Sequence, residues 1–387
     1  MHKLSRGIIA MGGVAAIAVG AATAEAASDT VKIGFNAPLT GFAAADGKSA
    51  RLGAELAVEE INAKGGINGK RVELVIYDDQ AKAVQAIPVA KKLIGQDGVK
   101  IAVSGSYSGP TRAAARVFQE AGIPYISAYA VHPDITRAGP FVFRTSTMGK
   151  VQGRAGPKLI ADIMGKKRVS IVTMNNDFGK SLSEGFKSVA ADFGITVLNE
   201  YEYSLKDRQF GPIVASIKAD NPEAIYAGGY YFTAGPLVSQ LRVAGVTAPV
   251  IGQEGYDGDT FIKIAKEAAE GVLITTTLDR DSKVPVIRRF IEAFERKAGF
   301  GADMVSASTH TAINVAVAAM RKAGTDDPKA IRDTIAATRN FTAATGTIGF
   351  NALGEVYKPV QVQVVRGGAW HHFAVIDDPK LLAPPTE

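Results

Sequence analysis

The sequence of 387 residues contains no cysteine, a single tryptophan and only five histidines. The lack of cysteine excludes disulfide bonds, thiolate metal sites and a lipid anchor on an N-terminal cysteine. The histidines form no H-E-x-x-H motif and no EF-hand loop is present, so the sequence implies no metal site and no cofactor. Beyond the N-terminal region, no stretch is long and apolar enough to span a bilayer. What remains is a large protein whose own core must provide its stability.

The N-terminus has the pattern of an export signal. Lys3 and Arg6 precede an apolar run over residues 8–22, and residues 24–26 (Ala-Glu-Ala) fit a small-x-small cleavage site. The run is shorter than the ~20 apolar residues of a spanning helix. We therefore expect a signal peptide over residues 1–26 and a mature protein that is free in the periplasm.

Charge is spread along the chain rather than gathered. The net charge is +6, and the one basic run, residues 165–168 (Gly-Lys-Lys-Arg), precedes an apolar segment, where a solvated turn is expected. Because no basic patch emerges, no nucleic-acid partner is expected. Hydrophobic residues make up 47% of the chain and charged residues 21%, as in a globular α/β protein. About 360 residues after cleavage suffice for two domains.

Strand-like and helix-like segments alternate over most of the length. Such alternation predicts parallel sheets with helices on both faces, and so many strands favour two sheets in two domains. The predicted strands cover residues 31–35, 72–77, 101–104, 125–127, 142–144, 169–173, 224–227, 250–252, 272–276, 347–350, 360–365 and 370–375. The predicted helices cover residues 47–64, 84–94, 111–121, 180–193, 211–219, 234–244, 285–297, 306–323 and 328–337.

Two motifs resemble those of enzymes, but each has another residue at a position that the motif requires. Residues 41–49 are almost a phosphate-binding P-loop, but Asp46 stands where its second glycine belongs. Residues 105–109 resemble a nucleophile elbow with Tyr107 at the position of the serine. The first motif is better explained as a helix start capped by Asp46 or Ser49. We therefore expect a binding protein rather than an enzyme.

Polar and aromatic residues follow several of the predicted strands. Ser108 lies between the strand 101–104 and a helix, where free N–H groups and a hydroxyl form either a carboxylate site or a plain helix start. Glu254 follows another strand, where it can receive a ligand's ammonium group or be a solvated loop acid. Phe178 and Tyr230 are similarly placed, and either line a pocket or simply pack.

Six further segments identify a family. They are residues 33–41 (IGFNAPLTG), 57–69 (AVEEINAKGGING), 77–79 (YDD), 133–136 (PDIT), 226–230 (YAGGY) and 252–255 (GQEG). Over nearly the whole mature chain, the sequence resembles the periplasmic leucine/isoleucine/valine-binding proteins, the solute receptors of branched-chain amino acid ABC importers.

The resemblance implies the type I periplasmic binding protein fold: two doubly wound α/β lobes joined by three crossovers, near residues 149, 277 and 355. The ligand would lie between the lobes. The implied partners are a small-molecule ligand and the membrane permease subunits of an ABC importer, with the receptor itself a monomer. The implied lobes comprise residues 27–149 with 278–355, and residues 150–277 with 356–387.

The resemblance also assigns roles to three residues. Ser108 matches the hydroxyl that binds the ligand's α-carboxylate, Glu254 matches the acid that receives its ammonium group, and Tyr230 matches an aromatic ring over the ligand. Four positions depart from the family pattern. They are Val131 in place of a threonine, Tyr129 at a small-residue position that contributes its backbone, Phe178 in place of a tyrosine, and Asp46 in place of an aromatic residue.

These departures bear on the identity of the ligand. An amino acid, branched-chain or related, is expected. Val131 and Phe178 make the pocket less polar, so an aromatic or other organic carboxylate, or a small amide, is the alternative. Asp46 either caps its helix or contacts the far end of the ligand.

Overall fold

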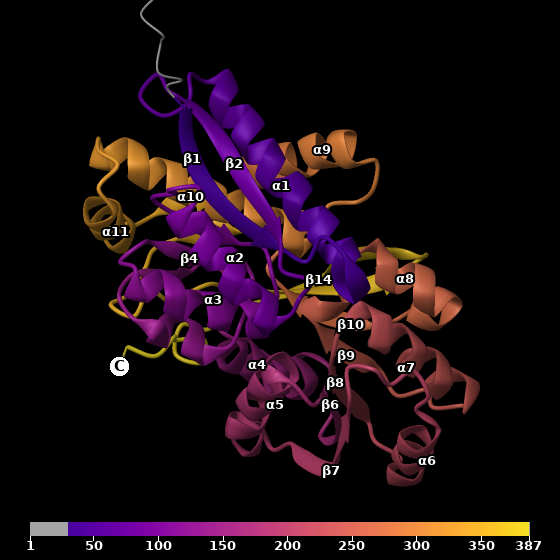
Figure 1. The fold of residues 1–387 in the computed structure, drawn as a ribbon. Helices are drawn as coiled ribbons and strands as arrows, with labels where there is room; N and C mark the ends of the chain where they lie inside the picture. Colours follow the sequence, from indigo (N-terminus) through magenta and orange to yellow (C-terminus); the bar gives the residue numbers. More distant parts are fainter. Residues whose placement is uncertain (1–29, 387) are drawn as a thin grey trace, which may run out of the picture.

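The computed structural model describes residues 30–386, and the predicted signal peptide, residues 1–26, lies outside them. The described chain forms two lobes, each built around its own sheet with helices packed against it (Figure 1). No helix in this part of the chain combines the length and the apolar character needed to cross a membrane.

The first lobe has a five-stranded parallel sheet. Its strands are β1 (Thr30–Ala37), β2 (Arg71–Asp78), β3 (Ala102–Ser104), β4 (Tyr125–Ser127) and β5 (Val142–Arg144). They lie in the order β2-β1-β3-β4-β5. A separate antiparallel pair is formed by β11 (Phe341–Ala343) and β12 (Gly346–Ile348).

The helices of this lobe come from two distant parts of the sequence. They are α1 (Ala44–Ala63), α2 (Ala83–Gly95), α3 (Ser108–Glu120), α9 (Pro285–Ala298), α10 (Met304–Ala323) and α11 (Pro328–Ala336). In Figure 1 the late helices, coloured orange, lie against the indigo α1, and α1 packs along α10. The chain therefore returns to the first lobe after building the second.

The second lobe has a seven-stranded mixed sheet. Its strands are β6 (Arg168–Met174), β7 (Thr196–Tyr203), β8 (Ala224–Gly228), β9 (Val250–Gln253), β10 (Leu273–Thr276), β13 (Val360–Arg366) and β14 (Ala369–Ile376). Their order is β14-β13-β10-β9-β8-β6-β7, with β13 and β14 antiparallel at one edge. All five residues of β8 are buried, as expected for a central strand covered on both faces.

Short and long helices cover this second sheet. The longer ones are α4 (Gly149–Lys158), α5 (Asp177–Val189), α6 (Gly211–Asp220), α7 (Tyr231–Val243) and α8 (Asp259–Ala265). The short turns of helix in the two lobes are η1 (Gly41–Ala43), η2 (Pro133–Ala138), η3 (Leu159–Ile163), η4 (Ala191–Phe193), η5 (Glu254–Tyr256) and η6 (Lys266–Ala269).

The chain passes from one lobe to the other after β5, after β10 and after β12. Two mainly parallel sheets with such passages agree with the alternation of segments in the sequence. The residue limits given above for the two lobes stay a prediction.

Several elements differ from the sequence-based expectation, among them β7, α4 and α3, and α8 and β11 were not predicted either. β7 was not predicted because it lies at the sheet edge with only its last residue buried, so no apolar run marks it. α4 was also missed, because its three glycines and Pro157 are poor helix formers. Gly153 is needed there, since a Cβ would lie 2.2 Å from the carbonyl oxygen of Leu182 on α5. α3 begins at Ser108, three residues before the predicted start.

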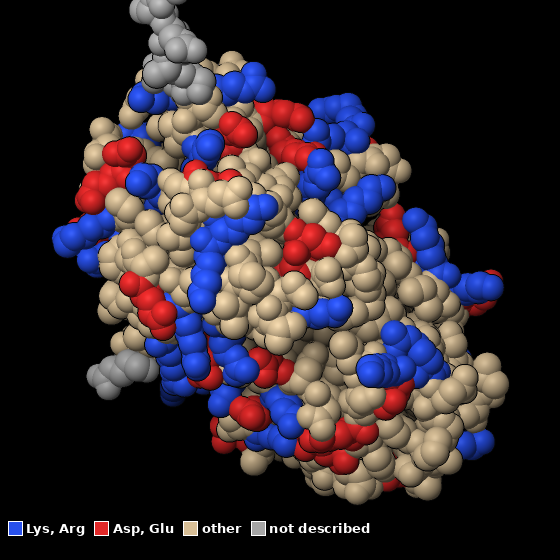
Figure 2. All heavy atoms as spheres, viewed as in Figure 1, with Lys and Arg blue, Asp and Glu red and all other residues tan. Residues whose placement is uncertain are grey.

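Charged side chains are mixed over the face shown in Figure 2. Lysine and arginine side chains alternate there with aspartate and glutamate side chains over both lobes. The net positive charge of the chain is thus distributed on this face rather than concentrated in one continuous basic surface.

Candidate functional site

The candidate site lies where the carboxyl ends of strands from the two sheets face each other. In the first lobe, Ser108 follows β3 and Tyr129 follows β4. In the second lobe, Phe178 follows β6, Tyr230 follows β8 and Glu254 follows β9. Open α/β sheets bind ligands at this end of their strands, because loops and helix N-termini gather there.

These residues line one cavity between the lobes. Its wall is formed by Asp46, Tyr107, Ser108, Tyr129, Ala130, Phe178, Tyr230, Glu254, Gly255 and Met304. The space left between them is about 10 Å³, which is about enough for one water molecule. The wall side chains therefore fill most of the cavity, and a larger ligand must move some of them apart.

One wall offers hydrogen-bond donors. Ser108 is 2% exposed and is the first residue of α3. Its Oγ accepts a hydrogen bond from the N–H of Val131 at 3.1 Å, so its own hydroxyl proton is available for another acceptor. The N–H groups in the first turn of a helix have no carbonyl partner within the helix. Together with the positive end of the helix dipole, they favour a negatively charged group.

The opposite wall contains a buried acid. Glu254 is 2% exposed, and among residues 30–386 neither of its carboxylate oxygens has a hydrogen-bond partner. Burial raises the pKa of Glu254 to about 8, and the charge of Asp257 adds to the rise, whereas Arg144 and Lys358 oppose it. An unpartnered buried carboxyl group is costly unless a cation or a donor arrives to satisfy it.

Aromatic rings occupy the middle of the cavity. The rings of Tyr107 and Tyr230 stack across the two lobes at 4.2 Å between centroids, with 4° between their planes. Phe178 stacks on the other side of Tyr230 at 4.7 Å. Tyr129 is buried, and its hydroxyl donates to the carbonyl oxygen of Gly105 at 2.7 Å.

Asp46 belongs to this cavity and does not cap its helix, so the capping prediction was wrong. The N-cap of α1 is Ala43, which follows the turn η1. The Tyr107 hydroxyl donates to Asp46 Oδ2 at 2.6 Å. Desolvation raises the pKa of Asp46 to about 8, although the Tyr107 hydrogen bond opposes the rise. Ser49 is not a cap either, because its hydroxyl donates to Asp303.

Six of the seven site residues chosen from the sequence line the cavity, and their contact with a ligand stays a prediction. The seventh, Val131, does not line the cavity. Its backbone N–H donates a hydrogen bond to the hydroxyl of Ser108, which does. Sequence reasoning missed Tyr107, although it directly precedes Ser108. Met304 was also missed, because it reaches the cavity from α10 and no local pattern signals this.

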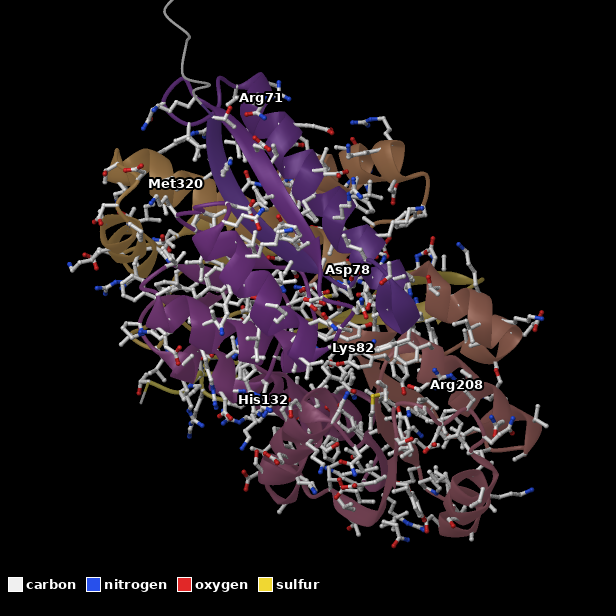
Figure 3. All side chains as sticks on the ribbon, in the orientation of Figure 1. Arg71, Asp78, Lys82, His132, Arg208 and Met320 are labelled. Atoms are coloured by element: carbon white, nitrogen blue, oxygen red, sulfur yellow. The ribbon has the colours of Figure 1, made fainter. Side chains whose placement is uncertain are left out.

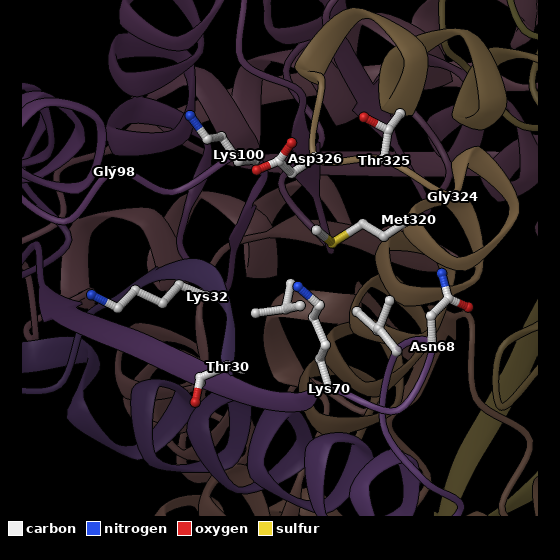
Figure 4. Close-up of a pocket in the computed structure, with 12 residues that line it drawn as sticks. Thr30, Lys32, Asn68, Lys70, Gly98, Lys100, Met320, Gly324, Thr325 and Asp326 are labelled. Carbon is white, nitrogen blue, oxygen red and sulfur yellow. The ribbon is translucent and has the colours of Figure 1, made fainter. Parts of the chain in front are cut away.

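A larger hollow lies elsewhere. Figure 4 shows it between the start of β1 and the end of α10, with a volume of about 560 Å³ and Lys32, Lys100 and Asp326 around it. Met320, which lines it, lies far from Asp78 and Lys82 near the junction of the lobes (Figure 3). The hollow is at the amino ends of the strands, the end that does not gather ligand-binding loops. In the described chain, no group of three or more His, Asp or Glu side chains could hold a metal ion.

Comparisons with known proteins identify the family of this chain. A family model described as periplasmic binding protein matches residues 30–369. A leucine-, isoleucine-, valine-, threonine- and alanine-binding protein of Pseudomonas aeruginosa is 32% identical over 358 residues, covering 92% of this chain and 93% of the relative. This chain belongs to the Leu/Ile/Val-binding family of type I periplasmic binding proteins. It is therefore a solute-binding protein of an ABC transporter, and not an enzyme.

Solved structures share the same architecture. The branched-chain amino acid transporter substrate-binding protein LivJ from Streptococcus pneumoniae, in complex with isoleucine, is 27% identical with a TM-score of 0.84, covering 90% of this chain and 99% of that one. A solute-binding protein from R. palustris in complex with benzoate is 24% identical with a TM-score of 0.82, covering 89% of this chain and 96% of that one. The second likeness shows the fold alone. The predicted fold class, an α/β protein with two mainly parallel sheets, is confirmed.

Proposed function

We propose that this receptor binds an amino acid, branched-chain or related, in the interlobe cavity and delivers it to the membrane permease subunits of its importer. The observation that carries this proposal is Glu254, a fully buried acid with two unpartnered oxygens in the cavity wall. A ligand ammonium group would satisfy this acid with charge-assisted hydrogen bonds. The relatives named for leucine, isoleucine and valine support the same class of ligand.

The two walls suggest how the amino acid is oriented. Its carboxylate would face the Ser108 hydroxyl and the N-terminus of α3, and its ammonium group would face Glu254. Both charged groups of the ligand would then meet a complementary partner in a cavity closed to water, where such interactions are strongest. Tyr230 would cover the ligand between them.

Closure of the lobes would follow from binding. Contacts already link the two lobes at the rim of the cavity, including the Tyr231 hydroxyl to the Phe42 carbonyl oxygen at 3.2 Å and Arg112 to Asp177 at 3.1 Å. A ligand that touches both walls is bound better by the closed state than by the open one, and so shifts the equilibrium toward closure.

The aromatic stack favours a second candidate ligand. Tyr107, Tyr230 and Phe178 stack on one another in the cavity, and a ring or planar group that separates them would take a place in the stack, which suits an aromatic or other organic carboxylate or a small amide. In this case Glu254 would stay protonated and donate a hydrogen bond. The second acid, Asp46, argues against a ligand whose only charge is negative.

Calorimetric titration of the mature chain with individual amino acids and with aromatic acids tests the proposal. We expect at least one amino acid to bind, and E254Q to weaken its affinity at least about a hundredfold, because a buried ammonium would lose its charge partner. The matched control is E292Q, which removes an exposed carboxylate on α9 and should leave the affinity unchanged. Binding of aromatic acids alone, or wild-type affinity in E254Q, would overturn the proposal.

A further inference from the structure

The cavity contains one more acid than the backbone groups of an amino acid require. With the ligand's carboxylate at Ser108 and its ammonium group at Glu254, Asp46 remains to face the side chain. Asp46 comes from α1 of the first lobe, whereas Glu254 comes from the second lobe, and both line the same small cavity.

The surroundings of Asp46 carry an excess of negative charge. Within residues 30–386, Tyr107 is its recorded side-chain hydrogen-bond donor and no Lys, Arg or His forms an ion pair with it. The acids Asp303 and Asp257 act on it electrostatically, and Arg280 is already paired with Asp257. An apolar side-chain end placed here would leave this buried carboxyl group protonated and without a charge partner, whereas a cation would let it ionise and pair, and a second carboxylate would be repelled by the acids nearby.

The rings beside Asp46 suit a cation as well. Tyr107 and Tyr230 are stacked face to face next to it, and Phe178 covers the other face of Tyr230, so a ligand that separates the rings uncovers these faces. The faces of aromatic rings are negative and attract cations, more strongly when water is excluded. A cationic group also has N–H donors that can replace the Tyr107 hydroxyl on Asp46.

We propose that Asp46 and the ring faces of Tyr107 and Tyr230 form a second recognition position for a positively charged end of the ligand's side chain. The receptor then prefers a dibasic amino acid to a neutral one of the same length. This inference rests on the proposed function and, within it, favours a related amino acid with a charged side chain over a branched-chain one. The limited free space favours a short side chain, because a longer one must push more of the wall aside.

Matched pairs of amino acids test the preference directly. Calorimetry at pH 7 compares 2,3-diaminopropionate with 2-aminobutyrate, 2,4-diaminobutyrate with norvaline, and ornithine with norleucine. We expect the charged member of at least one pair to bind about tenfold to a hundredfold more tightly, which is the range for hydrogen bonds to charged groups. D46N should remove this preference. The matched control D192N, which changes an exposed acid in η4, should keep it.

The outcomes separate this inference from the proposed function. If the neutral members bind as tightly as the charged ones, or if D46N keeps the preference, the inference is overturned and the proposed function stands. If no amino acid binds, both fall. The comparison within wild-type protein needs no variant, so it decides the matter even if D46N does not fold.

Discussion

Glu254 and Asp46 both carry a carboxyl group into the cavity, and desolvation raises the pKa of each to about 8. Carboxyl groups held in the protonated form lower the stability of the unliganded fold at neutral pH, because in the unfolded chain they ionise in water. Such costs are typical of binding sites, where a residue is placed for a ligand rather than for stability.

Replacing Glu254 should therefore stabilise the unliganded protein in a pH-dependent way. The folded state holds a proton that the unfolded state releases between pH 4.5 and about 8, so the free energy of unfolding falls as pH rises through this window. E254Q removes the titrating group, and with it this fall in the free energy of unfolding. We expect E254Q to raise the free energy of unfolding by about 1–3 kcal/mol at pH 8 and by little at pH 4.

Urea unfolding at both pH values measures this effect. E292Q is the control, because its exposed carboxylate should change stability by less than about 0.5 kcal/mol. An E254Q variant that is less stable than wild type at pH 8, or equally stabilised at both pH values, would show that Glu254 is not the strained acid described here.

The sequence predicts the position of a single site residue only where the neighbouring segments show that it follows a strand. Ser108, Tyr230 and Glu254 follow predicted strands, so their position at the strand ends was predictable. For Asp46 the sequence left a helix cap and a ligand contact open, because the choice depends on the turn η1 before its helix and on Tyr107 lying beside it. That contact joins segments far apart in the chain, and no local pattern encodes it.

At the scale of elements, a buried ion pair connects β5 to the last passage between the lobes. Arg144 is fully buried, and its Nε lies 3.0 Å from Oε2 of Glu355. The same guanidinium donates to the carbonyl oxygens of Ala130 at 2.6 Å and His132 at 2.7 Å. It therefore holds together β5, the loop after β4 that forms part of the cavity wall, and the chain between β12 and β13.

Breaking this pair should be strongly destabilising. R144M leaves the carboxylate of Glu355 buried without its partner, which costs about 3–5 kcal/mol of unfolding free energy. The double variant R144M/E355Q should recover part of that loss, because the unpaired charge is gone. Chemical denaturation of the unliganded protein measures both values.

An exposed pair of the same chemistry serves as control. Arg288 and Glu292 lie 3.0 Å apart on α9, and each is 49% exposed. R288M should cost less than about 1 kcal/mol, because water screens such pairs. If R144M costs no more than R288M, the buried pair does not hold these elements together.

Most elements were predictable because burial leaves a clear apolar pattern. β4 and β5 have the predicted bounds, since each is a short buried run next to a turn. β7 and α4 were not predictable for opposite reasons. β7 is an edge strand without an apolar run, and α4 uses glycine to approach α5 closely, a tertiary demand that overrides helix propensity.

At the scale of the whole molecule, the two sheets and their passages could be expected from the alternation of segments and from the family resemblance. The close contact between the two lobes could not be expected from either. The stack of Tyr107 on Tyr230 joins loops from different sheets, and it reduces the cavity to about 10 Å³. Ligand entry must therefore begin with separation of the lobes or of these rings.

Counting the protons released on binding tests whether a ligand ammonium group pairs with Glu254. Pairing should lower the pKa of Glu254 from about 8, so a bound amino acid should displace its proton near pH 7. Titration calorimetry in buffers of different ionisation enthalpy should detect the release of up to about one proton for this acid. No release, or net proton uptake on binding, would contradict the pairing and favour a ligand that accepts a hydrogen bond from protonated Glu254.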